Sequence, residues 1–276
     1  MKYNSKGVKT TRNEVHKSIE GILEAVDTTL SGYNKKSLLS RRNAGEDVEL
    51  NEMFLDIMEK AEYYKSLSEG AFDAAAGPLF DIWGFGFTSD TLPSDERIAE
   101  AVERCKKQEV LNFNAIAQGY SCDLIAGYLH SIGVKDMLVN IGEIYCEGLN
   151  PSGKGWTIGI DLPLDGNNNP GEQLAGTWQS DGGAHGVVTS GNYRKFYIRD
   201  GKKYAHSIDP RTGRPVEHNL LSATVIAPTA TEADALATFF MVIGMEKAAA
   251  WLESHEGTEA CLIGADSTWK SPGFQP

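Results

Sequence analysis

The chain has 276 residues, of which 41% are apolar and 23% charged, an ordinary composition for a folded globular protein. Its formal net charge is -12, and an acidic chain without clustered Lys and Arg is unsuited to binding nucleic acid. No stretch is long and apolar enough to cross a membrane as a helix.

The first third of the chain is predicted to be helical. Apolar residues recur at helical spacing from Val15 to Leu30, and Gly32 ends the pattern. A second helix is predicted from Asn51, and residues 95–107 should form a short polar helix. Between them, Gly77-Pro78 is expected to break the chain before an aromatic, glycine-rich loop at residues 83–86.

The rest of the chain is predicted to mix strands and helices. Helices are expected from about Ile116 to Ser131, over 233–242 behind a capping box of Thr229 and Glu232, and over 246–253. Residues 166–171 should be an exposed loop. Strand candidates are 137–141, 144–147, 156–160, 186–190, 195–198, 203–207, 222–227 and 260–263. Because the helices are grouped rather than alternating with strands, the predicted fold class is α+β with largely antiparallel sheets, as one domain over 1–276.

The four cysteines are widely spaced, with no C-x-x-C pair and no zinc pattern. Cysteine is among the most buried residue types, so buried free thiols are favoured. The alternative is a disulfide, whose pairing could not be deduced from the sequence.

The segment Asp234-Ala235-Leu236-Ala237-Thr238 is a candidate metal site. Asp234 and Thr238 are four residues apart and share one face of a helix. A carboxylate and a hydroxyl suit a hard cation such as Mg²⁺. The alternative is a structural one, in which Asp234 is a helix-start acid favoured by the dipole and Thr238 bonds back to a carbonyl.

A second candidate is residues 112–120, a loop that leads into a helix with small residues where a backbone could approach a ligand closely. Its exposed N–H and C=O groups could hold phosphate or a cation. The alternative is a helix entry with a glycine packing contact. No G-x-G-x-x-G or Walker pattern accompanies it.

Three further segments could contribute side chains. His206, before a turn at 209–213, could be an acid, a base, a ligand or a structural residue. Residues 189–193 end a strand with a hydroxyl that is either a nucleophile or part of a tight turn. Residues 71–73 and the 83–86 loop could pack on a flat aromatic ligand or belong to the core.

In this order, these segments resemble the ApbE family of FAD:protein FMN transferases over roughly residues 20–265. The pattern S-x-Y-x-x-x-S-x-[LI]-S-R-x-N is found from Ser31 to Asn43, and F-D-x-x-x-G-P-L-x-x-x-W-G-F-G from Phe72 to Gly86. The motifs N-A-I-A-[KQ]-G-Y, V-N-I-G-[GE], T-S-G-x-Y, H-x-I-D-P-x-T-G-x-P and D-A-x-A-T follow. Each motif is weak alone, but seven in the right order make chance a poor explanation.

The resemblance implies a T-fold-like α+β fold and a Mg²⁺-dependent transfer of FMN from FAD to a Thr or Ser of a partner protein, with release of AMP. It implies Mg²⁺ ligands at Asp234, Thr238 and the carbonyl of Ala115, with Asp234 and His206 in catalysis. It implies FAD contacts at Tyr33, Ala71, Phe72, Asp73, Asn112, Gln118, Ser190, His206 and Ile208. The acceptor is expected to be a redox-pump subunit.

The sequence departs from the family pattern in three places. Gln118 stands where relatives also have a charged residue, and Asn112 where many have Asp. The family also opens with an apolar export segment and a Met-Gly-Thr strand, of which only Lys2-Tyr3 could be a tail. We therefore expect a trimmed form of an exported protein of the periplasmic side, with or without a lipid anchor in the inner membrane.

Two other functions share the same motifs: an FAD-binding protein without turnover, and a Mg²⁺-dependent pyrophosphatase that hydrolyses FAD to FMN and AMP. A scaffold that has lost its site is disfavoured because both Asp234 and Thr238 are present. A hydrolase built on Ser190 and His206 lacks an oxyanion or triad pattern.

Overall fold

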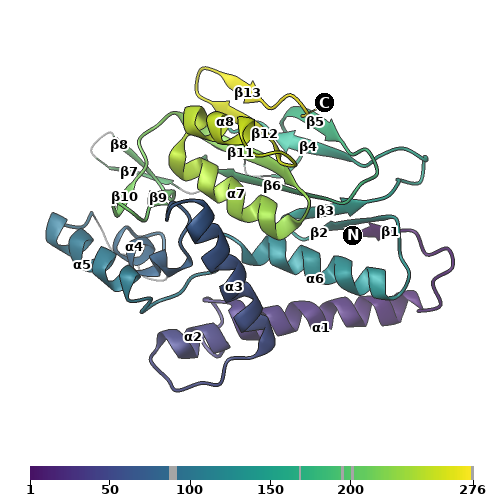
Figure 1. Ribbon diagram of the computed structural model, residues 1–276, viewed down its shortest axis with the longest axis horizontal. Helices are drawn as coiled ribbons and strands as arrows, with labels where there is room; N and C mark the ends of the chain where they lie inside the picture. The colour runs from purple at the N-terminus through teal and green to yellow at the C-terminus, as the bar shows by residue number, and fades with distance from the viewer. Residues whose placement is uncertain (87–91, 168, 194–195, 200–201, 275–276) are drawn as a thin grey trace. The chain divides into compact units, whose positions relative to one another are not determined.

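The computed structural model describes residues 1–86, 92–167, 169–193, 196–199 and 202–274. The chain divides into two compact units that are interleaved in sequence (Figure 1): the first comprises 1–22, 118–194 and 218–276, and the second 23–117 and 195–217. Helix α1 (Arg12–Leu30) begins in the first unit and ends in the second. That the whole chain forms one domain stays a prediction.

The first unit is built on a seven-stranded antiparallel sheet with the strand order β1-β2-β3-β6-β11-β12-β13. Its interior strand β11 reads Leu-Leu-Ser-Ala-Thr-Val-Ile-Ala and is buried along nearly its whole length, because both faces of the sheet are covered. The strands are β1 (Lys2–Tyr3), β2 (Met137–Asn140), β3 (Ile144–Glu147), β6 (His185–Gly191), β11 (Leu220–Ala227), β12 (Glu259–Gly264) and β13 (Thr268–Lys270).

Each face of this sheet has its own core. On one face, apolar residues of α1 and α6 (Ala117–Ser131) pack on Met137, Val139 and Tyr145. On the other face, Cys146 and Val187 pack on the hairpin of β4 (Thr157–Asp161) and β5 (Leu174–Gln179). The alternation of Tyr145 and Cys146 between the two cores follows from the two-residue period of a strand.

Helix α7 (Ala230–Ile243) crosses β6 and β11 (Figure 1) and is almost entirely buried. Thr229 caps its start, since its Oγ1 accepts from the backbone N–H of Glu232 at 3.1 Å. Gly244, with a φ of +82°, separates α7 from α8 (Met245–Glu253). The helix that carries the candidate metal residues is therefore fixed at both ends and along its length.

The second unit is mainly helical. Its core gathers apolar residues of η1 (Ala74–Ala76), α4 (Gly77–Ile82) and α5 (Asp95–Lys106) around Trp83 and Ile208. The remaining elements are α2 (Leu38–Asn43), α3 (Glu52–Leu67), the hairpin of β7 (Phe196–Arg199) and β8 (Lys202–Ala205), and the short pair β9 (Ile208–Asp209) and β10 (Arg214–Pro215).

Most predicted elements are confirmed, and the differences have local causes. Gly77-Pro78 begins α4 instead of breaking the chain, because proline is tolerated in the first turn of a helix. Strand β8 ends at Ala205, so the last two residues of the candidate 203–207 leave the strand, and position 195 lies outside the described residues. All four cysteines are buried and free. Among the described residues, no helix is long and apolar enough to span a membrane.

Candidate functional site

Asp234 is buried in the second turn of α7, where its side chain meets the start of α6. Only 5% of Asp234 is exposed, and its Oδ2 accepts a hydrogen bond from the backbone N–H of Gly119 at 2.9 Å. Gly119 is the third residue of α6, so its N–H has no carbonyl partner within that helix. A carboxylate at this position also interacts favourably with the positive end of the helix dipole.

The surroundings of Asp234 disfavour its ionised form. Burial raises its pKa from 3.8 to about 7, the bond from Gly119 opposes this, and the negative charge of Asp123 adds to the rise. A buried carboxylate in this condition gains most from a bound cation, which would hold it ionised. The carboxylate therefore fits the metal-binding role expected of it.

Thr238 lies one helical turn after Asp234 and is half-buried. The two oxygen donors share one side of α7, as their spacing predicts, and oxygen is the donor that Mg²⁺ prefers. Ala115 belongs to the second unit and is half-buried, so its carbonyl as a third ligand stays a prediction. In the part of the chain that the structure describes, no group of three or more His, Cys, Asp or Glu is arranged around a metal site.

The close backbone approach expected in the 112–120 segment occurs at Gly119. A Cβ on Gly119 would lie 2.2 Å from the carbonyl oxygen of Ala230 and 2.8 Å from Cβ of Asp234. Any side chain there would push α6 away from α7. Gln118, beside it, is exposed, and its Nε2 packs against Gly142, whose φ is +119°.

Ser190 lies on β6, where it pairs with Ala223 of β11 and is half-buried. The strand then turns, since a Cβ on Gly191 would lie 2.6 Å from the ring of Tyr193. The ring over Gly191 gives the T-S-G-x-Y segment a defined shape rather than a free tip. The hydroxyl of Ser190 remains a candidate FAD contact.

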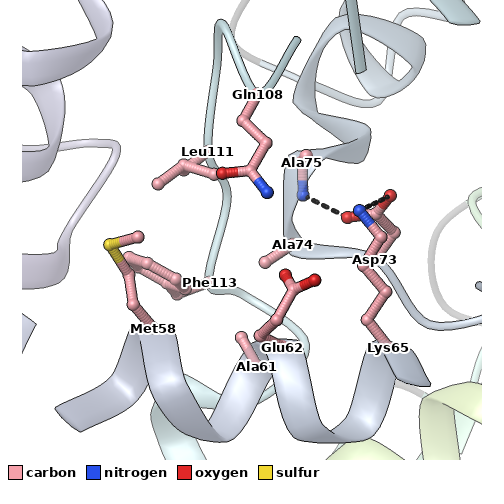
Figure 2. A pocket seen from close by; sticks show the side chains of 10 residues that line it. All are labelled: Met58, Ala61, Glu62, Lys65, Asp73, Ala74, Ala75, Gln108, Leu111 and Phe113. Carbon is pink, nitrogen blue, oxygen red and sulfur yellow. Dashed lines mark hydrogen bonds and ion pairs between the residues drawn. The ribbon is translucent and has the colours of Figure 1, made fainter. Parts of the chain in front are cut away.

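In the second unit, residues 71–73 lead into η1. Ala71 and Phe72 are 1% and 2% exposed, so both belong to the core and present almost no surface to a ligand. The Asp73 carboxylate accepts from the backbone N–H of Ala75 at 2.8 Å and pairs with Lys65 Nζ at 3.0 Å (Figure 2). Asp73 thus caps η1 through its own side chain.

A pocket beside Asp73 is lined by side chains of α3, by the start of η1 and by residues 108–113 (Figure 2). Its volume is about 20 Å³, which is room for a water molecule rather than a dinucleotide. Glu62 and Gln108 direct their polar ends toward it. The pocket is therefore too small to enclose a cofactor.

Asn112 is held by backbone and side-chain bonds from two other motifs. Its N–H donates to the carbonyl of Ala74 at 2.7 Å, and its Oδ1 accepts from the N–H of Asn114 at 2.9 Å. Asn43 donates its Nδ2 to the carbonyl of Leu111 at 2.7 Å and accepts the N–H of Leu111 at 2.9 Å. The structure thus brings the first, second and third motifs together around Asn112.

Tyr33 is 64% exposed, unusual for a large aromatic side chain. Its hydroxyl accepts from Nδ2 of Asn114 at 3.4 Å, which places it next to the Asn112 segment. The exposed ring face is available for stacking on a flat ligand. Both observations fit its predicted role in FAD binding.

His206 and Ile208 follow β8 in the second unit. His206 is half-buried, and its ring lies edge-on to Phe85 with centroids 6.4 Å apart. Ile208 is 2% exposed and belongs to the core around Trp83, so it presents almost no surface to FAD. Asp209 holds the following turn by accepting from the backbone and side chain of Arg211.

Two residues that support the site were not predicted from the sequence. Asn43 accepts a hydrogen bond from the backbone N–H of Leu111, and Asp123 accepts hydrogen bonds from the first two N–H groups of α7. Asn43 ends a quoted motif, but nothing local shows which backbone it binds. Asp123 is the acid nearest to the N-A-I-A-Q-G-Y motif on its helix, which could have marked it.

The sequence and fold were compared with those of known proteins. The family model of the ApbE family matches residues 2–262. The FAD:protein FMN transferase of Escherichia coli strain K12 is 34% identical over 291 residues, covering 95% of this chain and 81% of the relative. A flavin transferase ApbE structure from Vibrio cholerae superposes with a TM-score of 0.82 at 30% identity, covering 99% of this chain and 93% of that one. The apo flavinyl transferase ApbE of Pseudomonas stutzeri gives 0.85 at 32% identity, covering 99% and 90%.

Proposed function

The chain belongs to the ApbE family, and we propose that it transfers FMN from FAD to a Thr or Ser hydroxyl of a partner protein in a Mg²⁺-dependent reaction that releases AMP. The observation that carries this proposal is the buried carboxylate of Asp234, with the Thr238 hydroxyl one turn away on the same helix. Curated relatives named FAD:protein FMN transferase support the reaction.

Asp234 and Thr238 would hold the metal, together with the carbonyl of Ala115. Bound there, Mg²⁺ would supply charge neutralisation for the diphosphate of FAD. This accounts for how a chain of net charge -12 could bind a dianionic group.

The residues that the family resemblance assigns to FAD would act as follows. Tyr33 would stack its exposed ring on a flat part of FAD. Residues 71–73, Asn112 and Ile208 would contribute the contacts that the family resemblance implies, and Gln118 and Ser190 would donate or accept neutral hydrogen bonds. Rigid supports such as Asp73 and Asn43 would hold these groups in place before FAD binds, which lowers the cost of ordering them.

In the transfer step, a bond forms between the acceptor hydroxyl oxygen and the FMN-side phosphorus of FAD. The bond from that phosphorus to the bridging oxygen breaks, and AMP leaves with that oxygen. The hydroxyl proton goes to a base, for which His206 is our candidate. Phosphoryl transfers of this kind depend mainly on positioning and on neutralising charge.

Hydrolysis of FAD to FMN and AMP is the second candidate activity. It needs the same residues, with water in place of the acceptor hydroxyl, and so would share the requirement for Asp234. The two activities differ in whether FMN ends on protein or in solution.

We also propose an extracytoplasmic location, where the acceptor would be a redox-pump subunit. The support is the resemblance of the sequence motifs to an exported family. Cell fractionation of the native host would test the location, and a cytoplasmic pool of active protein would contradict it.

The proposed function is tested by incubating the full chain with FAD, Mg²⁺ and an acceptor protein. We expect intact-mass spectrometry to show an added FMN on a Thr or Ser, and chromatography to show AMP in equal amount. Asp234→Ala should lose both products. AMP and free FMN without a mass gain would favour hydrolysis, and FAD binding without AMP would favour a storage protein.

A further inference from the structure

Helices α6 and α7 of the first unit cap each other at their starts. Asp234 of α7 accepts from the N–H of Gly119 in the first turn of α6 at 2.9 Å. In return, Asp123 of α6 accepts from the N–H groups of Ala230 and Thr231, the first two residues of α7, at 2.9 and 2.8 Å. Asp234 lies four residues after Ala230, where Asp123 binds α7. Asp123 likewise lies four residues after Gly119, where Asp234 binds α6.

Several hydrogen bonds join Asp123 to the start of α7. Both of its oxygens accept, and Oδ2 also takes a very short bond from the Thr231 hydroxyl. The Oγ1 of Thr229 accepts a hydrogen bond from the next backbone N–H, that of Glu232, at 3.1 Å. Together they satisfy the N–H groups that the first turn of a helix leaves without carbonyl partners.

The caps that Thr229 and Asp123 provide constrain α7 in different ways. Thr229 lies on the chain that enters α7, so its cap acts within α7. Asp123 comes from more than a hundred residues earlier and ties the first turn of α7 to a different helix. Because α6 also touches α7 through Gly119, where no Cβ would fit beside Ala230, the pair leaves α7 little freedom to rotate or slide.

The charge of Asp123 has a cost that a neutral cap would avoid. It places a second carboxylate beside the buried carboxylate of Asp234, whose ionised form it disfavours. A Ser or Asn could cap α7 without that repulsion.

We propose that Asp123 is a positioning residue for the metal ligands: by holding the first turn of α7 against α6, it sets the place of Asp234 and Thr238 on that helix. The inference rests on the proposed Mg²⁺-dependent function. Partners that orient metal ligands typically change metal affinity by about 10- to 100-fold when they are removed.

The test is the Mg²⁺ dissociation constant of the full chain without FAD, measured by titration calorimetry. Asp123→Asn keeps the shape but turns one acceptor into a donor that faces an N–H. We expect its dissociation constant to rise about 10- to 100-fold, and Asp123→Glu, which keeps the charge, to recover part of the loss. Thr229→Ala is the matched control, because it removes the other cap of the same helix and should leave the constant unchanged.

A second readout separates positioning from simple loss of stability. In flavinylation assays of Asp123→Asn, the Mg²⁺ concentration for half-maximal rate should rise while the rate at saturating Mg²⁺ is largely kept. If Asp123→Asn does not fold, Thr231→Val carries the test, since it removes only the hydroxyl bond to Asp123 and should weaken Mg²⁺ binding in the same direction by less.

Each result bears on a different claim. Unchanged Mg²⁺ affinity in both Asp123→Asn and Thr231→Val would overturn the positioning role and leave the proposed function intact. Equal weakening by Thr229→Ala would also overturn it, by showing that any damage to the cap suffices. A wild-type chain that binds no Mg²⁺ would overturn the proposed function and this inference with it.

Discussion

Asp234→Asn should make the metal-free protein less sensitive to pH. In the folded protein, burial and the charge of Asp123 raise the pKa of Asp234 from 3.8 to about 7. Between these values the folded chain holds a proton that the unfolded chain has lost, so its free energy of unfolding falls as the pH rises. Asparagine cannot ionise, and its Oδ1 can still accept from Gly119.

The size of the effect follows from the two pKa values. The full difference corresponds to about 4 kcal/mol above pH 7, of which about 2 to 3 kcal/mol develops between pH 5 and pH 8. We therefore expect the variant to gain about that much stability relative to wild type over this interval, in EDTA. Added Mg²⁺ at pH 8 should stabilise wild type and not the variant.

The assay is urea unfolding of both proteins at several pH values. Asp136→Asn is a control without a pH slope in this interval, because hydrogen bonds from Leu149 and Asn4 lower the pKa of Asp136 from its usual value of 3.8. Its carboxylate is then ionised in both the folded and the unfolded chain between pH 5 and pH 8, and the variant should lose a constant amount of stability. Parallel stability curves for Asp234→Asn and wild type would refute the reasoning, since they would mean that the carboxylate is not desolvated in the folded chain.

Three other substitutions test the site and its frame. Tyr33→Ala should weaken FAD binding by about 0.5–1.5 kcal/mol if its exposed ring stacks on the cofactor; a fluorescence titration in which Tyr63→Ala, equally exposed on α3, is just as impaired would reject that placement. Thr238→Val should raise the Mg²⁺ dissociation constant roughly tenfold, or about 1.4 kcal/mol, with calorimetry as the check and wild-type affinity as the contrary result. Gly119→Ala should cost about 1–3 kcal/mol in urea unfolding because its Cβ meets backbone, whereas Gly127→Ala on the same helix, with open space around it, should gain about 0.5–1 kcal/mol; equal effects would refute the close approach.

The elements that the sequence predicts well are those set by local chemistry. The Thr229 cap and the apolar run behind it define α7 within one turn of its observed bounds. Strand β5 could not be recognised because most of its residues are exposed and lack alternation. The two-residue strands β9 and β10 and the six-residue helix α2 are too short to leave a periodic pattern.

The candidate site also has features that the local sequence predicts and features that it does not. The common face of Asp234 and Thr238 follows from helical spacing alone, and the smallness of Gly119 suggests a close approach. The partner at Gly119 is 115 residues away, and the bond from Asp123 to Ala230 spans 107. Such contacts depend on how the helices pack on the sheet, which no local pattern encodes.

The central claim is FMN transfer from FAD to protein at a Mg²⁺ site on α7. It is tested most directly by the intact mass of an acceptor protein after incubation with the chain, FAD and Mg²⁺, alongside EDTA and Asp234→Ala reactions. The account predicts an added FMN in the first reaction and an unchanged mass in the other two. An equal FMN adduct in all three would contradict it.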